Sequence, residues 1–159
     1  MHVMMVCTGN MCRSPMAEAI LEAEFERLGA EGFQVSSAGT GAWEGRAPSD
    51  GAMLVALENG LDISGHRSRH LSRALVDQAD IIFTMSRQHS GRAEKLGGDG
   101  RVFLLGEYAG KKRSKAEVAD PYGEELHVYR DTFEQLNGLM QIAAERLIKE
   151  RDEQDRGDQ

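Results

Sequence analysis

One short stretch near the N-terminus restricts the fold and the chemistry of this 159-residue chain more than any other. The apolar run Met4-Met5-Val6 leads to Cys7 and is followed by a loop that contains Gly9 and Asn10. A short apolar run bounded by turn residues is typical of a strand buried on both faces. Gly and Asn adopt positive φ at low cost, so the loop is predicted to curl until successive N–H groups point inward.

The residues that follow predict a helix that begins where the loop ends. Ser14 is a preferred N-cap residue, and Pro15 suits the first helical position. The amides of the loop and of the helix N-terminus then form an anion site. Cys7 faces these amides, and together with the Arg13 guanidinium they favour the thiolate form of its sulfur. Because Arg13 also matches two oxygens of a phosphoryl group, the stretch predicts a metal-free site for phosphoryl transfer to cysteine.

The pattern Cys-x5-Arg-Ser-Pro over residues 7–15 resembles the signature of the low-molecular-weight protein-tyrosine phosphatases. A bare Cys-x5-Arg is weak evidence, and a buried cysteine beside a structural arginine is the alternative. Here the pattern follows an apolar strand, contains Gly9-Asn10 and runs into Met16-Ala17-Glu18, which makes the resemblance specific. It covers nearly the whole chain and implies a four-stranded parallel sheet in the order 2-1-3-4.

The rest of the chain alternates between strand and helix patterns. Strands are predicted at 4–6, 33–38, 81–85 and 102–105, and helices at 15–28, 49–59, 73–78, 86–96 and 126–151. This alternation predicts an α/β fold with helices on both faces of a parallel sheet, and ligands in such sheets bind at the carboxyl ends of the strands. We expect an irregular segment at 106–125, a single domain over 1–151 and a charged, disordered tail at 152–159.

Composition narrows the partners and the compartment. A formal net charge of −7 argues against nucleic acid as a partner. No apolar run has the length of a membrane span, and no secretory signal pattern is present. Two cysteines five residues apart are a poor disulfide framework, so we expect a cytoplasmic protein that is a monomer or weak dimer. The chain offers no ligand set for a metal, and no cofactor is expected.

Phosphoryl transfer to a thiolate requires a general acid for the leaving group, and Asp120 is the best candidate. Asp120-Pro121-Tyr122-Gly123 follows the last predicted strand, and Pro121 stiffens the backbone there. Alone, such a tetrapeptide indicates a surface turn. Its resemblance to the Asp-Pro-Tyr acid loop of the family implies that Asp120 protonates the leaving group and then deprotonates the attacking water.

The resemblance also implies roles for the residues around the nucleophile. Asn10, Ser37 and His66 would hold the loop by hydrogen bonds, with His66 structural rather than catalytic. Ser14 would assist the thiolate as the leaving group of the second step. Arg67, Arg69 and Arg73 are predicted to be ordinary surface residues. Phosphate binding is assigned to the whole loop, that is to Thr8, Gly9, Asn10, Met11, Cys12 and Ser14.

Cys12 has two interpretations. It is either a small buried apolar residue, which is the common fate of a free cysteine, or a partner that traps Cys7 as a disulfide under peroxide. The spacing of the two cysteines within one tight loop is compatible with both.

Three side chains, Met11, Trp43 and Tyr122, are predicted to line a deep slot that selects phosphotyrosine over the shorter phosphoserine. The loop also resembles a bacterial branch of the family that cleaves phosphoarginine, as does the segment 123–129. In that branch a threonine typically stands at position 11, so the bulkier Met11 favours tyrosine, with arginine as the alternative. A thiol-dependent arsenate reductase would need a further cysteine pair, and a non-catalytic phosphoprotein-binding module would not need both Cys7 and Asp120.

Overall fold

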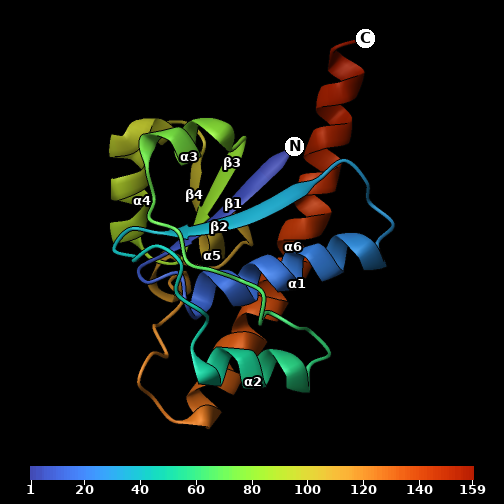
Figure 1. Ribbon diagram of the computed structural model, residues 1–159. Helices are drawn as coiled ribbons and strands as arrows, with labels where there is room; N and C mark the ends of the chain where they lie inside the picture. The colour runs from blue at the N-terminus through green and yellow to red at the C-terminus, as the bar shows by residue number, and fades with distance from the viewer.

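In the computed structural model, which describes residues 1–159, four parallel strands form one sheet in the order β2-β1-β3-β4 (Figure 1). The strands are β1 (His2–Cys7), β2 (Gln34–Gly39), β3 (Ile81–Thr84) and β4 (Val102–Leu104). In the register of the sheet Cys7 pairs with Gly39, and Val6 pairs with Thr84. The carboxyl ends of the three strands β2, β1 and β3 therefore lie side by side, which confirms the predicted fold class and strand order.

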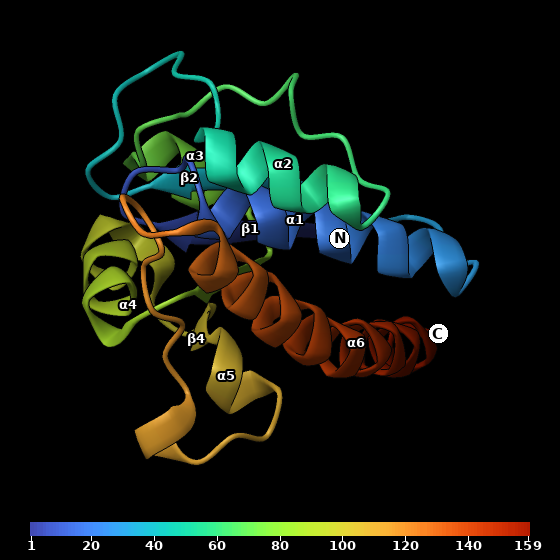
Figure 2. The same ribbon diagram turned by 90° about the horizontal axis from the view of Figure 1, so that it is seen from below.

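Helices cover both faces of this sheet, with α3 and α4 on one side and α1 and α6 on the other (Figure 1). Seen from below, α2 lies against α1, and it also contacts α6 (Figure 2). The helices are α1 (Arg13–Arg27), α2 (Asp50–Glu58), α3 (Arg73–Gln78), α4 (Arg87–Ala93), α5 (Leu105–Tyr108) and α6 (Leu126–Gly157). A π-helical turn, Glu94–Gly98, extends α4, and no helix of the chain combines the length and apolarity needed to cross a membrane.

The central strand β1 shows why the N-terminal apolar run contains no alternating polar residues. Val3 and Met5 belong to the core under α1 and α6, whereas Met4 and Val6 belong to the core under α3 and α4. Because a strand points successive side chains to opposite faces, a strand covered on both faces must be apolar throughout. Burial on both sides fixes β1 and, with it, the position at which Cys7 leaves the sheet.

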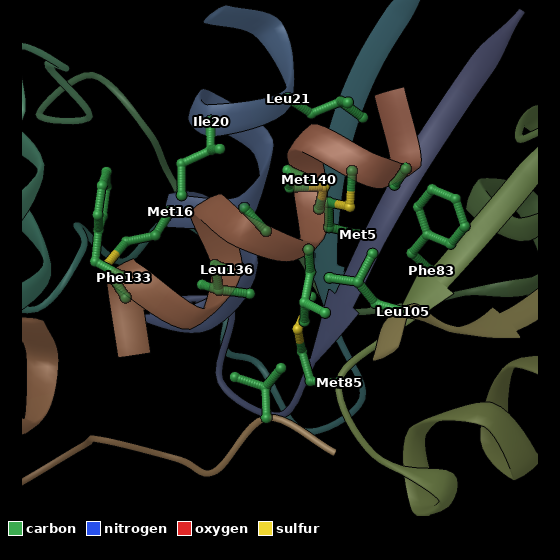
Figure 3. Packing of buried hydrophobic residues seen from close by; sticks show 14 of the residues in the cluster. Met5, Met16, Ile20, Leu21, Phe83, Met85, Leu105, Phe133, Leu136 and Met140 are labelled. Atoms are coloured by element: carbon green, nitrogen blue, oxygen red, sulfur yellow. The ribbon is translucent and has the colours of Figure 1, made fainter. Parts of the chain in front are cut away.

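The larger core lies between the sheet and the pair α1–α6 (Figure 3). Met16 and Ile20 of α1 meet Leu136 and Met140 of α6, and Met5 of β1 closes the layer from the sheet side. All of these side chains are fully or almost fully buried. Full burial of one such side chain stabilises the fold by about 1.5–3 kcal/mol, so this layer anchors the start of α1 firmly below the loop.

The start of α1 differs from the prediction. The helix begins at Arg13, two residues before Pro15, and its N-cap position is Cys12, whose side chain makes no capping bond. Ser14 therefore lies inside the first turn, and its hydroxyl is directed to the loop instead of to the helix amides. Of the two residues expected at positive φ, only Asn10 adopts it, with φ 55°.

The segment predicted to be irregular contains α5 and a short 3₁₀ helix, Arg113–Lys115. Leu105 and Tyr108 are buried in the core, so the chain turns back directly after β4 and does not continue as a strand. Gly106 permits the segment at Ala116 to pack closely against α5, because a Cβ atom at position 106 would collide with the backbone of Ala116.

The last helix, α6, continues to Gly157, past residue 151 where the sequence placed the end of the domain. Arg151 explains part of the extension: its guanidinium lies 4.2 Å from the centre of the Phe33 ring and also bonds the carbonyl of Glu31. These contacts join α6 to the segment before β2, and the Glu, Gln and Arg residues beyond them are good helix formers.

Candidate active site

A pocket of about 170 Å³ opens at the carboxyl end of β1. The loop that follows β1, here called the phosphate loop (residues 7–14), forms its floor, and a second segment, here called the acid loop (residues 118–123), forms one wall. The pocket brings together residues from both segments that the sequence predicted. They are Cys7, Thr8, Gly9, Met11, Cys12, Arg13, Asp120 and Tyr122.

The nucleophile candidate Cys7 is buried at the end of β1, and its Sγ lies 2.9 Å from Ser14 Oγ. The Asn10 side-chain amide donates to that same hydroxyl oxygen at 2.7 Å. The Ser14 hydroxyl proton is thereby left available to the sulfur. A hydroxyl donor at this distance stabilises a thiolate more than a neutral thiol, because hydrogen bonds to charged acceptors are the stronger ones.

Asn10 braces the phosphate loop through both the nitrogen and the oxygen of its side-chain amide and through its backbone carbonyl. Its Nδ2 donates to Ser14 Oγ and, at 2.9 Å, to Ser37 Oγ, while its Oδ1 accepts from the backbone N–H of Arg69 at 2.9 Å. Its backbone carbonyl accepts a hydrogen bond from His66 Nε2 at 2.9 Å. The structure thus brings together the three residues, Asn10, Ser37 and His66, that the sequence assigned to loop support.

The imidazole of His66 acts as a neutral donor in this arrangement. Burial lowers its pKa, an effect that the hydrogen bond to Asn10 opposes and the charges of Arg69 and Arg67 reinforce. Arg69 is not the ordinary surface residue that the sequence suggested, because its guanidinium donates twice to the Ser37 carbonyl at 3.1 Å. It lies in a loop without periodicity, so no sequence pattern marked it.

Gly39, the last residue of β2, lets the phosphate loop cross the sheet edge. A Cβ atom at this position would collide with the carbonyl of Thr8 and approach the amide of Asn10 to 2.9 Å. Cβ atoms in proteins are essentially never found this close to other atoms, so only glycine fits at position 39. The close contact holds the loop amides against β2.

Arg13 connects the two loops. Its side chain is buried, and its Nη1 donates to the carbonyl of Val118 at 2.9 Å. Its Nη2 donates to Thr8 Oγ1 at 3.4 Å and lies 3.6 Å from the Asp120 carboxylate. Its Nε has no hydrogen-bond partner and is the single buried side-chain nitrogen or oxygen of the protein in that state. A buried guanidinium N–H without an acceptor is costly, so this nitrogen indicates where an anion belongs.

Asp120 stands on the rim of the pocket with half of its side chain exposed. Its Oδ1 accepts from the backbone N–H of Tyr122 at 3.0 Å, which fixes the carboxylate within its own turn. The buried residues Val118 and Pro121 anchor the acid loop on either side. Val118 is held further by its N–H, which donates to the carbonyl of Met85 at 2.9 Å. An exposed acid between two buried anchors is suited to meet a leaving group at the mouth of the pocket.

Sequence reasoning missed His89, which lies in the first turn of α4 with its Nε2 2.8 Å from Thr8 Oγ1. Burial, assisted by the charge of Arg13, lowers the pKa of His89 to about 4, against the opposite effects of Asp120 and Glu117. The sequence does contain a signal for His89, because this residue closely follows β3, and β3 is the neighbour of β1 in the sheet. Residues that follow neighbouring parallel strands lie at the same edge of the sheet, where ligands bind.

Cys12 is buried and has polar neighbours. Its Sγ lies 3.1 Å from Ser49 Oγ and 3.6 Å from the Tyr129 hydroxyl. Burial raises the pKa of the Cys12 thiol, an effect that the hydrogen bonds of Ser49 and Tyr129 partly oppose. Both Cys7 and Cys12 are free thiols that line the same pocket.

Of the three predicted pocket walls, Met11 and Tyr122 line the pocket and Trp43 does not. The Trp43 side chain lies in the loop after β2 and is 74% exposed. Nowhere in the chain do three or more His, Cys, Asp or Glu side chains gather as a possible metal site.

The whole chain is similar to known phosphatases. Residues 2–154 match the family described as low molecular weight phosphotyrosine protein phosphatase. Wzb of Escherichia coli K12, a low molecular weight protein-tyrosine-phosphatase, is 34% identical over 145 residues, which cover 90% of each chain. The protein-arginine-phosphatase of Bacillus subtilis is 35% identical over 153 residues, 95% of this chain and 99% of that one.

The fold is also similar to those of solved phosphatase structures. YwlE arginine phosphatase, in a C7S mutant with phosphorylated active site serine, superposes with a TM-score of 0.89 at 33% identity. The superposition covers 96% of this chain and 99% of that one. A low molecular weight protein tyrosine phosphatase from T. tengcongensis gives a TM-score of 0.84 at 38% identity and covers 92% of this chain and 99% of that one.

Proposed function

Because the chain belongs to the low molecular weight phosphotyrosine protein phosphatase family, we propose that it dephosphorylates phosphotyrosine in proteins through a cysteinyl-phosphate intermediate. The observation that carries this proposal is the unpaired Nε of Arg13, buried beside the phosphate loop. Arg13 Nε and Nη2 form one edge of a planar guanidinium, and such an edge pairs with two oxygens of a phosphoryl group. A phosphoryl dianion over Cys7 would supply the acceptor that the protein itself lacks.

In the first step, the Cys7 thiolate attacks phosphorus and the bond from phosphorus to the substrate oxygen breaks. The loop amides and Arg13 stabilise the charge on the equatorial oxygens, and Asp120 gives its proton to the leaving oxygen. The proton donor and the nucleophile must act from opposite sides of the phosphorus. The geometry fits this requirement, because Cys7 lies buried at the pocket floor and Asp120 stands at the rim.

In the second step, Asp120 takes a proton from water, the water oxygen bonds to phosphorus, and the phosphorus–sulfur bond breaks. The sulfur leaves as a thiolate, which the Ser14 hydroxyl at 2.9 Å is placed to stabilise. The C7S mutant of YwlE with its phosphorylated active site serine is consistent with transfer to the corresponding side chain in that protein. No metal ion takes part in either step.

Turnover of a generic aryl phosphate by the wild type and by Cys7→Ser tests this function. We expect the variant to lose all measurable activity while keeping its fold, since serine is not ionised at neutral pH. The wild type should remain active in EDTA and be inhibited by vanadate. Activity that survives in Cys7→Ser, or that a chelator abolishes, would overturn the proposal.

The relatives differ in the phosphorylated residue, because proteins of comparable identity are named as phosphatases for tyrosine and for arginine. We favour phosphotyrosine because Met11 and Tyr122 line the pocket with apolar and aromatic surface that suits a flat ring. Phosphoarginine is the second candidate. Matched peptides carrying each group should be hydrolysed with a higher kcat/KM for phosphotyrosine, and a large preference for phosphoarginine would reverse this assignment.

The partners and the compartment follow from the chemistry. A phosphorylated protein is the proposed substrate, and the chain is proposed to act as a monomer or weak dimer in the cytoplasm. A thiolate nucleophile needs a reducing compartment to stay active, and both cysteines of this chain are free.

Cys12 is proposed to protect Cys7 from irreversible oxidation. Peroxide would convert the Cys7 thiolate to a sulfenic acid, and the Cys12 thiol would then displace water to form a disulfide that added thiol reduces. The presence of both sulfurs in one pocket favours this route. After peroxide treatment and thiol addition, wild-type activity should recover fully and Cys12→Ser activity should not. Equal recovery would remove the protective role.

A further inference from the structure

The mechanism above gives no role to the side chain of Thr8, although Thr8 lines the pocket next to the nucleophile. Its methyl group faces Gly41, where an added Cβ atom would lie 3.6 Å from Cγ2. Its hydroxyl faces the other way, within hydrogen-bond distance of both His89 and Arg13. The direction of the hydroxyl proton follows from what these two neighbours can donate.

The hydrogen bonds of His89 determine its tautomer. The backbone N–H of Ser86 donates to His89 Nδ1 at 3.2 Å, so Nδ1 must carry the lone pair. The ring proton therefore lies on Nε2, which donates to Thr8 Oγ1 at 2.8 Å. The pKa of about 4 agrees with a neutral ring: burial lowers it most and Arg13 lowers it further, whereas Asp120 and Glu117 raise it.

Arg13 donates to the same oxygen from its Nη2 at 3.4 Å. A hydroxyl oxygen has two lone pairs and a single proton. With both lone pairs engaged by donors, the Thr8 proton must point in a third direction. No acceptor group of the protein lies within hydrogen-bond distance on that side, whereas the pocket that Thr8 lines is open.

We infer that the Thr8 hydroxyl is a further hydrogen-bond donor to the bound phosphoryl group, directed to it by His89 and Arg13. This role presupposes the proposed function, since it requires a phosphoryl dianion over Cys7. His89 is then a positioning residue, which acts on the substrate only through Thr8. A hydroxyl that accepts two hydrogen bonds is polarised and becomes a stronger donor, which suits an anionic acceptor.

Calorimetric binding of inorganic phosphate to the wild type, Thr8→Val and Thr8→Ser tests the role directly. Valine keeps the shape of threonine and removes the hydroxyl, whereas serine keeps the hydroxyl. We expect binding to be roughly 10- to 100-fold weaker in Thr8→Val, the scale for one hydrogen bond to a charged group. Thr8→Ser should stay within about threefold of the wild type. Thr132→Val, the same change at a buried position of α6 that does not line the pocket, is the matched control and should bind phosphate normally.

A pair of His89 variants separates positioning from general structural damage. His89→Gln supplies a neutral N–H donor, while His89→Leu supplies none. We expect His89→Leu to weaken phosphate binding as much as Thr8→Val does, and His89→Gln to restore most of the loss. Combining His89→Leu with Thr8→Val should cause no further loss, because His89 acts through Thr8.

The outcomes distinguish this role from the proposed function. A wild type that neither binds phosphate nor hydrolyses an aryl phosphate would overturn both. Normal phosphate binding by folded Thr8→Val, with an active wild type, would overturn the role of Thr8 alone, even if kcat fell. Should Thr8→Val fail to fold by circular dichroism, the His89 pair decides, and equal binding by the Gln and Leu variants would overturn the role.

Discussion

The phosphate loop and the acid loop meet at Arg13, but the protein holds them in different ways. The phosphate loop is buried along most of its length, and side chains or backbone groups of β2, α1 and the segment 66–69 brace it. The acid loop is anchored at the buried residues Val118 and Pro121, while Asp120 between them is exposed. Binding geometry is thus built into the interior of the fold, and the proton donor is mounted on its surface.

This difference teaches where stability and activity are linked. The phosphate loop must present several N–H groups to one anion, so each brace that fixes it also contributes to folding. The acid loop must admit a bulky substrate and release a product, so its functional carboxylate gains nothing from burial. Substitutions in the first region should therefore affect folding and phosphate binding together. Substitutions of exposed residues in the second should affect turnover or the binding of a large substrate and leave stability unchanged.

Apart from loss of the nucleophile, the largest expected effect comes from Asp120→Ala, which removes the general acid. With a phosphotyrosine peptide, kcat should fall about 10²- to 10⁴-fold. With a substrate whose leaving group needs no proton, the loss should be much smaller. Because the carboxylate is half exposed, the free energy of unfolding should change by less than about 0.5 kcal/mol.

Glu124→Ala, an exposed acid close by in the same connection, is the matched control and should leave kcat unchanged. Equal losses with good and poor leaving groups would remove the acid role of Asp120. A loss of several kcal/mol in stability would instead contradict the difference between the two loops.

The next effect falls on stability, through Asn10→Ala. This change removes three hydrogen bonds of the buried amide and places alanine at φ 55°. Together they should lower the free energy of unfolding by about 4 kcal/mol. Denaturant unfolding measures the loss, and calorimetry should show weaker phosphate binding in the same variant.

Asn10→Gly separates the loss of the hydrogen bonds from the backbone strain. Glycine adopts positive φ freely, so this variant loses only the hydrogen bonds. It should be more stable than Asn10→Ala by about 1 kcal/mol. Asn137→Ala on α6 is the control for a partly exposed asparagine. Full stability of Asn10→Ala would mean that the phosphate loop does not depend on this brace.

A somewhat smaller effect is expected from acid, at the junction of the two loops. In the folded protein His89 has a pKa of about 4, compared with an ordinary value of 6.5. The unfolded chain binds a proton there before the folded one does, so stability is complete above pH 6.5 and is lost as pH falls towards 4. The loss amounts to roughly 3 kcal/mol at most.

His89→Gln has no group that titrates at this position, so its stability should depend less on pH in this window. Denaturant unfolding at several pH values gives the free energy of unfolding of both proteins. In the difference between the variant and the wild type, the contributions of Asp120 and Glu117, which both proteins share, cancel. Parallel pH profiles for the two proteins would show that His89 is not held neutral in the folded state.

The sequence predicts the phosphate loop far better than its surroundings, for a physical reason. Cys7, Asn10 and Arg13 lie within one short stretch of the chain, so their spacing alone determines most of the local geometry. Asp120 and the support from Ser37 and His66 were identified by family resemblance, since nothing local brings them to the loop. The rule that ligands bind at the carboxyl ends of parallel strands predicted the edge of the sheet at which the pocket opens.

Other features of the site depend on tertiary geometry that no pattern encodes. The carbonyl of Val118 orients Arg13, and any residue type can offer a carbonyl. Arg69 donates its backbone N–H to Asn10 and its guanidinium to the Ser37 carbonyl. Neither contact requires a particular pattern of neighbouring residues, so the sequence around Arg69 resembles that of an exposed loop. The local signal for Ser14 as an N-cap was real, but the tertiary hydrogen bonds to Cys7 and Asn10 outweigh it. Trp43 shows the opposite error, in which residue type suggested a pocket wall that the loop path does not supply.

The smallest effect separates the pocket rim from the pocket floor. It concerns Tyr122 and Trp43, the two aromatic residues that the sequence assigned to the pocket walls. Tyr122 lines the pocket beside Asp120 and is 64% exposed, whereas Trp43 lies outside the lining. Tyr122→Ala should raise KM for a phosphotyrosine peptide about 3- to 10-fold, the scale of one aromatic contact. Binding of inorganic phosphate should not change, because the phosphate loop is intact. Trp43→Ala should raise KM less than Tyr122→Ala does. A larger effect for Trp43→Ala would mean that substrate contacts extend beyond the pocket, along the loop after β2, and that the slot first predicted from residue type forms when a peptide binds.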